Sequence, residues 1–222
     1  MNYLLPILSI AIGFLFVILF KPKKPASIKL FLAFSGAFLL ALTVFELLPE
    51  VYKSQSNYVG VFIMVGIILQ IFLEFFSKGA EHGHVHLHTQ DKTFPWMLFL
   101  SLSIHAFLEG MPIHSHDHLV LGIVIHKVPI AIILTLFFIQ AKYSKKQTFI
   151  FLLLFAVMTP AGSLAADKIQ FFNAYSVEIT ALVIGIFLHV STTILFESSE
   201  GHKFNMAKLL IVIFAAFLAY ML

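Results

Sequence analysis

Two adjacent apolar segments of the chain carry ionisable side chains that hydrocarbon should reject. The first segment contains His105 and Glu109, and the second contains His126 and Lys127. Ionisable groups at membrane depth are costly, so by default they face a protein interior or a water path and mark ion or proton handling. These four residues are therefore the first candidates for the function.

The spacing of His105 and Glu109 suits the binding of a single cation. Residues four apart share one face of a helix, one turn apart, and His126 begins the corresponding stretch of the next apolar segment. Imidazole and carboxylate ligands suit zinc, iron or manganese, whereas sites made only of oxygen suit magnesium or calcium. The chain has no cysteine, so the ligands are comparatively exchangeable, which fits transit better than permanent structural binding.

Lys127 is the unusual member of this cluster. A buried ammonium group either loses its proton or pairs with a carboxylate, and we expect Glu109 or Glu46 as that partner. We interpret Lys127 as a fixed cation at what would otherwise be a second metal position. The alternative is a lysine that snorkels to the nearer membrane interface.

Two prolines lie within three residues of the cluster. Pro112 and Pro129 cannot donate to the carbonyls four residues earlier, at Leu108 and Ile125. We therefore expect a kink in each helix and a freed carbonyl oxygen beside the site. Prolines are also common in membrane helices without any such role.

The elements that position these residues are expected to be membrane helices. The chain has 222 residues, of which 60% are hydrophobic and 11% charged, a composition that excludes a soluble domain. Spanning segments must satisfy their own backbone, which favours helices, and about 20 apolar residues cross the hydrocarbon core. We expect an all-α integral membrane protein with one transmembrane transport domain over 1–222. Eight segments qualify as spans: 3–20, 28–48, 58–77, 95–113, 119–140, 148–166, 177–197 and 205–222.

The distribution of lysine predicts the orientation. All fourteen basic residues are lysine, and only Lys53 and Lys168 follow even-numbered spans. The positive-inside rule then places both termini outside the cytoplasm, and the net charge of +3 indicates topology rather than a nucleic-acid partner. Eleven lysines follow odd-numbered spans: Lys21, Lys23, Lys24, Lys29, Lys78, Lys92, Lys142, Lys145, Lys146, Lys203 and Lys208.

A short internal similarity links the second and seventh predicted spans. The run from Gly36 to Leu39 leads to Glu46, and the similar run from Gly185 to Leu188 leads to Glu197. With two helices between triplets 1–3 and 6–8, a repeat of three helices is inverted across the membrane, as in many transporters. We expect this 3+2+3 arrangement, although a chance match is the alternative.

Other polar residues are candidates for the path of an ion. Glu46, Glu74 and His189 lie in predicted spans, where they either line the path or are an interfacial carboxylate or a satisfied core histidine. Alternating histidines in the loop 78–94 favour cytoplasmic metal capture, and a cluster on the external side favours cation collection at the entrance. The loop histidines are His82, His84, His86 and His88, and the external residues are His114, His116, Asp117 and His118.

Together these motifs resemble those of the ZIP (Zrt/Irt-like) family of divalent-metal transporters. The resemblance covers most of the chain and implies eight spans with both termini outside and a His-rich cytoplasmic loop after the third span. The matching motifs are Glu46-Leu47-Leu48-Pro49-Glu50 for H-L-L-P-E, His105-Ala106-x-x-Glu109-Gly110 for H-N-x-x-D/E-G, His126-Lys127-Val128-Pro129 for H-E/K-x-P, Thr159-Pro160-Ala161-Gly162 in span six and Gly185-Ile186-Phe187-Leu188-His189 in span seven.

The chain departs from the family pattern at one metal position. Many members of the family hold a binuclear centre, but here Ala106, Lys127, Thr159 and Ile130 stand where further ligands are common. The resemblance is greatest to the subset with H-K-x-P in the fifth span. It implies a single metal site, with Lys127 in place of the second metal.

The expected function is uptake toward the cytoplasm of a divalent transition metal, zinc first and iron or manganese next. The metal ligands are His105, Glu109 and His126, and the metal is cargo rather than a resident cofactor. An intramembrane metal-dependent hydrolase is an alternative, although the spacing is His-x-x-x-Glu rather than His-Glu-x-x-His; a metal sensor without flux is another. We expect no enzymatic activity, a location in the plasma membrane (the inner membrane of a bacterium), and compatibility with a homodimer.

Overall fold

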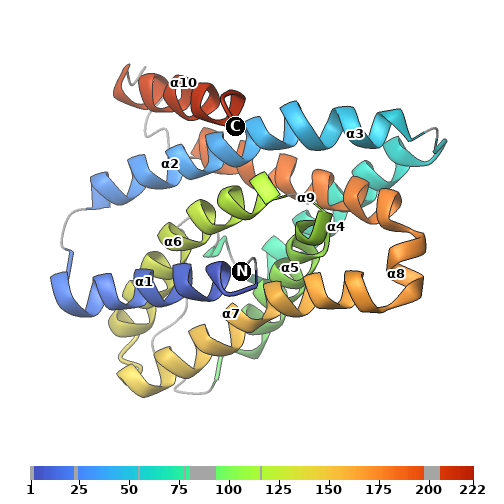
Figure 1. Ribbon diagram of the computed structural model, residues 1–222. Coiled ribbons are helices and arrows are strands. Elements are labelled where there is room, and N and C mark those ends of the chain that lie inside the picture. Colours follow the sequence, from blue (N-terminus) through green and yellow to red (C-terminus); the bar gives the residue numbers. More distant parts are fainter. Residues whose placement is uncertain are drawn as a thin grey trace.

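The computed structural model is a bundle of helices (Figure 1). It describes residues 3–22, 25–54, 56–77, 79–80, 94–115, 117–197 and 206–222, and within these ranges it contains no strand. The elements are α1 (Leu5–Phe20), α2 (Pro25–Leu42), the π-helical turn η1 (Thr43–Leu47), α3 (Leu48–Lys53), α4 (Val59–Ser77), α5 (Trp96–Gly110), the 3-10 helix η3 (Met111–Ser115), α6 (Asp117–Gln140), α7 (Lys145–Lys168), α8 (Gln170–Ala174), α9 (Ser176–Glu197) and α10 (Met206–Tyr220).

Six helical segments are long and apolar enough to cross a membrane. They are Ile28–Lys53, Val59–Ser77, Trp96–Ile113, His118–Gln140, Lys145–Lys168 and Ser176–Phe196. The helices α1 and α10 are also apolar but shorter, with 16 and 15 residues. The expected class, an all-helical integral membrane protein, is therefore confirmed, and six of the eight expected spans have the required length.

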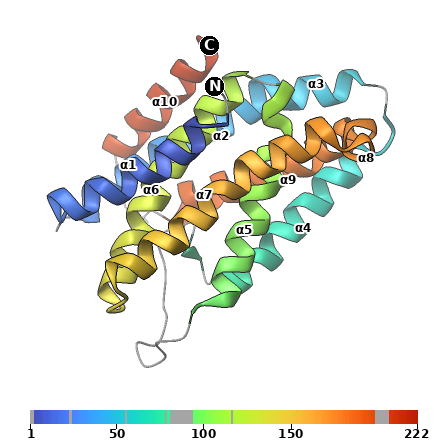
Figure 2. The same cartoon turned by 60° about the horizontal axis from the view of Figure 1, so that its bottom comes forward.

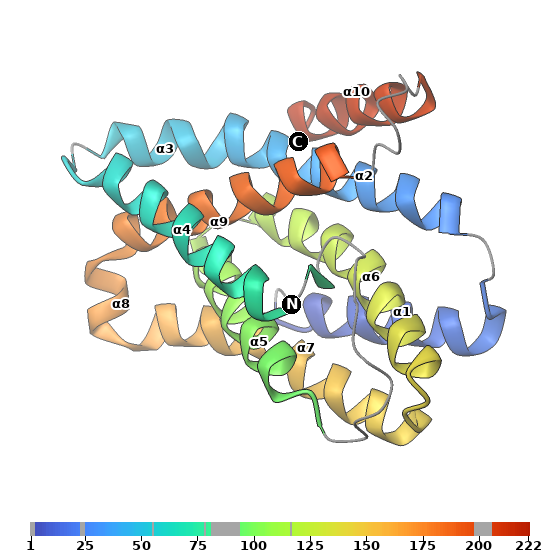
Figure 3. The same cartoon turned by 180° about the vertical axis from the view of Figure 1, so that it is seen from behind.

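The helices pack in pairs. The helix α4 lies along α9, α5 along α7, α1 along α6, and α10 along α2, and α2 also contacts both α6 and α9. Figure 2 shows α5 beside α7, and Figure 3, seen from behind, shows α4 crossing α9. The first half of α6 contributes to one apolar cluster and its second half to another. His126 and Lys127, between the two halves, are also buried.

Glycine allows two of these pairs to touch backbone to backbone. A Cβ atom on Gly66 of α4 would overlap the carbonyl oxygen of Leu182 in α9, and a Cβ atom on Gly185 would overlap that of Ile63. Small residues at membrane helix interfaces let backbones approach closely in this way. The pair of α4 and α9 therefore forms a close contact that fixes how the side chains of the two helices meet.

Glycines also allow α5 and α7 to touch backbone to backbone. A Cβ atom on Gly110 would overlap the carbonyl oxygen of Thr159, and a Cβ atom on Gly162 would overlap that of Phe107. Both contacts lie close in sequence to Glu109. The glycines of α5 and α7 therefore bring the Thr159 turn against the Glu109 turn.

The prolines have different effects from those expected. Pro112 lies in the 3-10 helix that follows α5, and the Met111 N–H donates to the Leu108 carbonyl. The prediction of a freed Leu108 carbonyl was therefore wrong, because the chain tightens to a shorter hydrogen bond before the proline. The helix α6 continues through Pro129 without a break. The π-helical distortion of the second span, η1, lies directly before the helix α3, which contains Pro49.

The close contact between α4 and α9 can be tested with two glycines of the same helix. We expect Gly66→Ala to lower Tm in detergent, because overpacking costs about 1–3 kcal/mol. A Cβ atom on Gly60 would have no other atom within 4 Å, so Gly60→Ala should leave Tm unchanged or raise it. Thermal unfolding of the two variants provides the comparison, and equal Tm values would contradict the tight contact.

Candidate metal centre

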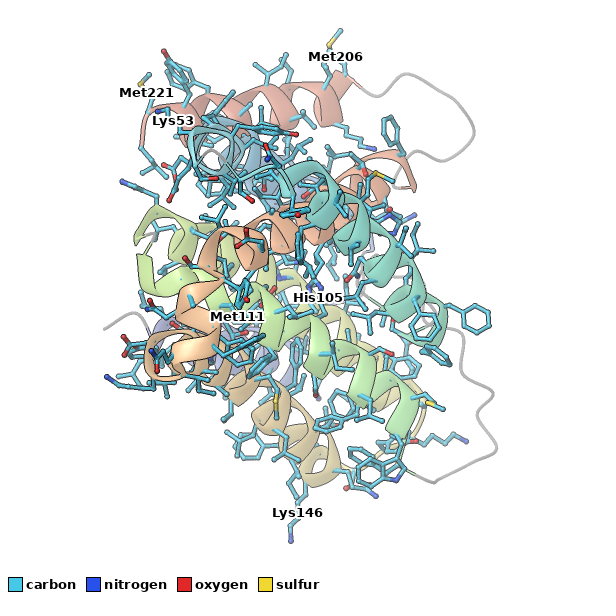
Figure 4. All side chains as sticks on the ribbon, turned by 90° about the vertical axis from the view of Figure 1, so that its right-hand side faces the viewer. Lys53, His105, Met111, Lys146, Met206 and Met221 are labelled. Carbon is cyan, nitrogen blue, oxygen red and sulfur yellow. The ribbon has the colours of Figure 1, made fainter. Side chains whose placement is uncertain are left out.

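His105 and Glu109 lie on the inward face of α5. Their side chains are 4% and 1% exposed, and His105 Nε2 lies 3.3 Å from Glu109 Oε2, whereas the neighbouring Ile104 faces outward. Figure 4 shows His105 among the helices in the middle of the molecule. The expected sharing of one helix face is confirmed, and the two atoms that meet are an imidazole nitrogen and a carboxylate oxygen, which are both metal-ligand types.

Two further helices contact the carboxylate of Glu109. Lys127 Nζ from α6 forms an ion pair with Oε1, and the Thr159 hydroxyl from α7 donates to the same oxygen over 3.0 Å. The Lys127 ammonium also lies 4.6 Å from the centroid of the Phe155 ring, a cation–π contact. Glu109 is thus held by groups from α5, α6 and α7.

These contacts exclude one of the two interpretations of Lys127. Its side chain is 2% exposed and pairs with Glu109, so it does not snorkel to an interface. Of the two expected carboxylate partners, Glu109 is the one that Lys127 meets. Glu46 lies in the π-helical turn η1 and is partly buried.

Gln70 is a member of the site that the sequence interpretation missed. Its side chain is fully buried in α4, and its Oε1 lies 3.0 Å from His105 Nδ1. Because the amide oxygen can only accept, Nδ1 carries the proton in this contact. In a neutral ring the lone pair is then on Nε2, beside Glu109, which is the tautomer that a metal ligand requires.

Thr159 was noted in the sequence only as a departure from the family pattern. In the structure its hydroxyl donates to Glu109 Oε1 and lies 3.0 Å from the Ala106 carbonyl oxygen. The signal for Gln70 was an amide within a predicted span, one turn before Glu74. The signal for Thr159 was a hydroxyl in the position where a carboxylate is common.

His126 is buried in α6, next to Lys127 in the sequence. Within the described ranges, no three His, Asp or Glu side chains come together as a group that could hold a metal ion. The arrangement is a His105 and Glu109 pair whose carboxylate also binds an ammonium. The ligand role of His126 stays a prediction.

Glu74 and His189 form a second pair outside this cluster. His189 Nε2 lies 2.6 Å from Glu74 Oε2, and the two side chains are 19% and 22% exposed. They come from α4 and α9, the pair of helices that is in close contact at Gly66 and Gly185. The structure thus brings together two residues that the sequence had placed separately on the path.

The remaining candidates belong to the two loops. His118, at the start of α6, is exposed. The side chains of His114 and Asp117 lie outside the part of the chain that the structure describes, as does His116. The same holds for the loop histidines His82, His84, His86 and His88.

Buried His, Glu and Lys side chains on adjacent helices of a polytopic membrane protein form a candidate ion-handling site. The family model of the ZIP zinc transporters matches residues 78–221, and the chain belongs to this family. It is similar to zinc transporter ZIP1 of Danio rerio, with 30% identity over 89 residues, which are 37% of this chain and 30% of the relative. The chain thus spans less than a third of that relative's length in the match. The family assignment favours a transporter over the hydrolase alternative.

The ion pair makes a prediction about stability. Glu109→Gln should lower Tm strongly, because removing one partner of a buried ion pair leaves an uncompensated charge and costs about 3–5 kcal/mol. Adding Lys127→Met should recover most of the loss, because neither charge then remains. Thermal unfolding of the single and double variants in detergent checks this. A double variant no more stable than Glu109→Gln would contradict the buried pair.

Proposed function

We propose that this protein moves a divalent transition metal across the membrane, zinc first and iron or manganese next. The observation that carries the proposal is the buried contact between His105 Nε2 and Glu109 Oε2 inside a helical membrane protein of the ZIP zinc transporter family. Imidazole and carboxylate together are ligands for this class of metal. Neither ligand is a thiolate, so no soft sulfur ligand slows the release of the metal.

The metal would replace the direct contact between the two side chains. Zinc lies about 2.0–2.2 Å from nitrogen and oxygen ligands, so two ligands of a tetrahedral zinc are about 3.3–3.6 Å apart. His105 Nε2 and Glu109 Oε2 already lie 3.3 Å apart. Gln70 keeps Nδ1 of His105 occupied, which leaves Nε2 for the metal. We place His126 as the third protein ligand, and water completes the coordination.

Lys127 limits the charge of the site. It pairs with Glu109, so a bound dication would share the carboxylate with a fixed cation. Such sharing weakens binding, because like charges repel at short range. We infer a single site of modest affinity, with Lys127 where a second metal would otherwise lie.

The route of the ion follows from the other polar residues. Entry is from the external side, past the residues at the start of α6, and exit is past Glu74 and His189 toward the His-rich loop. Glu46 lies beside the route as an acceptor or ligand. The entrance group is His114, His116, Asp117 and His118, and the loop group is His82, His84, His86 and His88.

The packing of the helices supports eight spans and an inverted repeat. A helix of 16 residues is about 24 Å long, and α1 lies along the full-length span α6 as α10 lies along α2. In this repeat, α1, α2 and α4 correspond to α7, α9 and α10, and α5 corresponds to α6. The pair of α4 and α9 then corresponds to the pair of α10 and α2. In the same way, the pair of α1 and α6 corresponds to the pair of α7 and α5. All four pairs pack in the structure.

Such a repeat favours alternating access, in which one group of helices moves against another around the site. The lysine distribution predicts that both termini lie outside the cytoplasm, and we propose uptake toward the cytoplasm as the direction of transport. We place the protein in the plasma membrane. A homodimer is compatible with this arrangement.

Transport can be tested with a variant and a control from the same helix. His105→Ala should abolish zinc uptake into proteoliposomes, because it removes one of two adjoining ligands. Ser101 is buried one turn earlier on α5, where its hydroxyl donates to the Met97 carbonyl over 2.9 Å, and Ser101→Ala should keep wild-type flux. Wild-type uptake by His105→Ala would refute the site, and metal binding without flux in the unaltered protein would favour a sensor.

Lys127 can be tested by counting bound metal. We expect Lys127→Asp to bind one more zinc ion per chain than the unaltered protein, because it restores a carboxylate at the second position. Zinc should also raise the Tm of this variant more than that of the wild type, since metal relieves the repulsion between Asp and Glu109. Elemental analysis after gel filtration gives the difference. An unchanged metal count would contradict the role proposed for Lys127.

A further inference from the structure

Glu74 and His189 have the same chemistry as the first pair but a different position in the fold. An imidazole nitrogen and a carboxylate oxygen again meet, here at 2.6 Å between α4 and α9. Unlike His105 and Glu109, both side chains are about one-fifth exposed. A pair that is partly open to its surroundings can exchange an ion more easily than a buried one.

The helices that carry this pair hold it in place. Gly185 lies one turn before His189 on α9, and a Cβ atom there would overlap the backbone of α4 at Ile63. Gly66 makes the reciprocal contact from α4. Because the backbones touch, the separation of Glu74 and His189 is set by the helix pair rather than by two flexible side chains.

Gln70 connects the two pairs. It lies four residues before Glu74 on α4, so the two side chains share one helix face with Cβ atoms about 5–6 Å apart. At the same time Gln70 Oε1 contacts His105 Nδ1. Gln70 on α4 therefore contacts the first pair and lies one turn from the glutamate of the second pair.

We propose that Glu74 and His189 form a second divalent-metal site, of low affinity, which receives the ion from the His105 and Glu109 site. This inference rests on the proposed transport function. Two protein ligands leave the other coordination positions to water, which suits a site that an ion occupies only briefly. The competing explanation is a hydrogen bond that merely joins α4 to α9.

Glu74→Gln separates these explanations, because glutamine can still accept from His189 but carries no charge. A metal site predicts a loss of zinc flux of at least about tenfold with Tm unchanged. The matched control is Thr193→Val on α9, which removes only a hydroxyl bonded to the His189 carbonyl and should keep full flux. Wild-type flux in Glu74→Gln would overturn the proposal.

A binding assay tests the second site without relying on transport. The chain has no cysteine, so His189→Cys introduces a single thiol, and Cd²⁺ bound by that thiol and Glu74 should slow its alkylation by N-ethylmaleimide. Adding Glu74→Gln should raise the Cd²⁺ concentration needed for protection at least about tenfold. Adding His105→Ala instead should leave protection unchanged.

The two proposals fail in different ways. Absence of zinc flux in the unaltered protein would overturn the proposed transport, while the alkylation assay still decides whether Glu74 helps to bind metal. Absence of protection by Cd²⁺ in His189→Cys, or equal protection with and without Glu74, would overturn the second site. Neither result depends on the state of the first site.

Discussion

The carboxylate of Glu109 is the group around which the interior is arranged. A buried charge is tolerated only when it is paired and hydrogen-bonded, and here Lys127, Thr159 and His105 meet that requirement from three helices. Each contact needs its helix in a particular rotation and register. The ion pair therefore ties the packing of α5, α6 and α7 to the chemistry of the site.

Glycine provides the close approach that this arrangement requires. The Thr159 hydroxyl can reach Glu109 because α5 and α7 touch at Gly110 and Gly162. In the same way, Gly66 and Gly185 bring α4 against α9. The absence of side chains at these positions is as important to the two polar pairs as the polar residues themselves, since any larger residue would separate the helices.

The sequence predicted the parts of the site that depend on local spacing. His105 and Glu109 meet because four residues make about one helical turn. Pairing of Lys127 with Glu109 or Glu46 was one of the outcomes expected for a buried ammonium group, beside loss of its proton. The contact of Gln70 with His105 could not be predicted, because it joins α4 to α5 and leaves no periodic signal. The prediction of a free carbonyl at Leu108 was wrong for a local reason. At the end of α5, just before Pro112, the Met111 N–H donates to that carbonyl.

The lysine has a consequence for how the ion can leave. A site that holds both a carboxylate and an ammonium carries less negative charge than one with two carboxylates, so it attracts a dication less strongly. Weak binding assists release only if the next groups can accept the ion before it returns. Gln70 contacts His105, and Glu74 lies one turn further along α4, where its carboxylate contacts the imidazole of His189. The proposed transfer therefore runs from Glu109, whose carboxylate pairs with an ammonium group, toward Glu74, whose carboxylate contacts an imidazole.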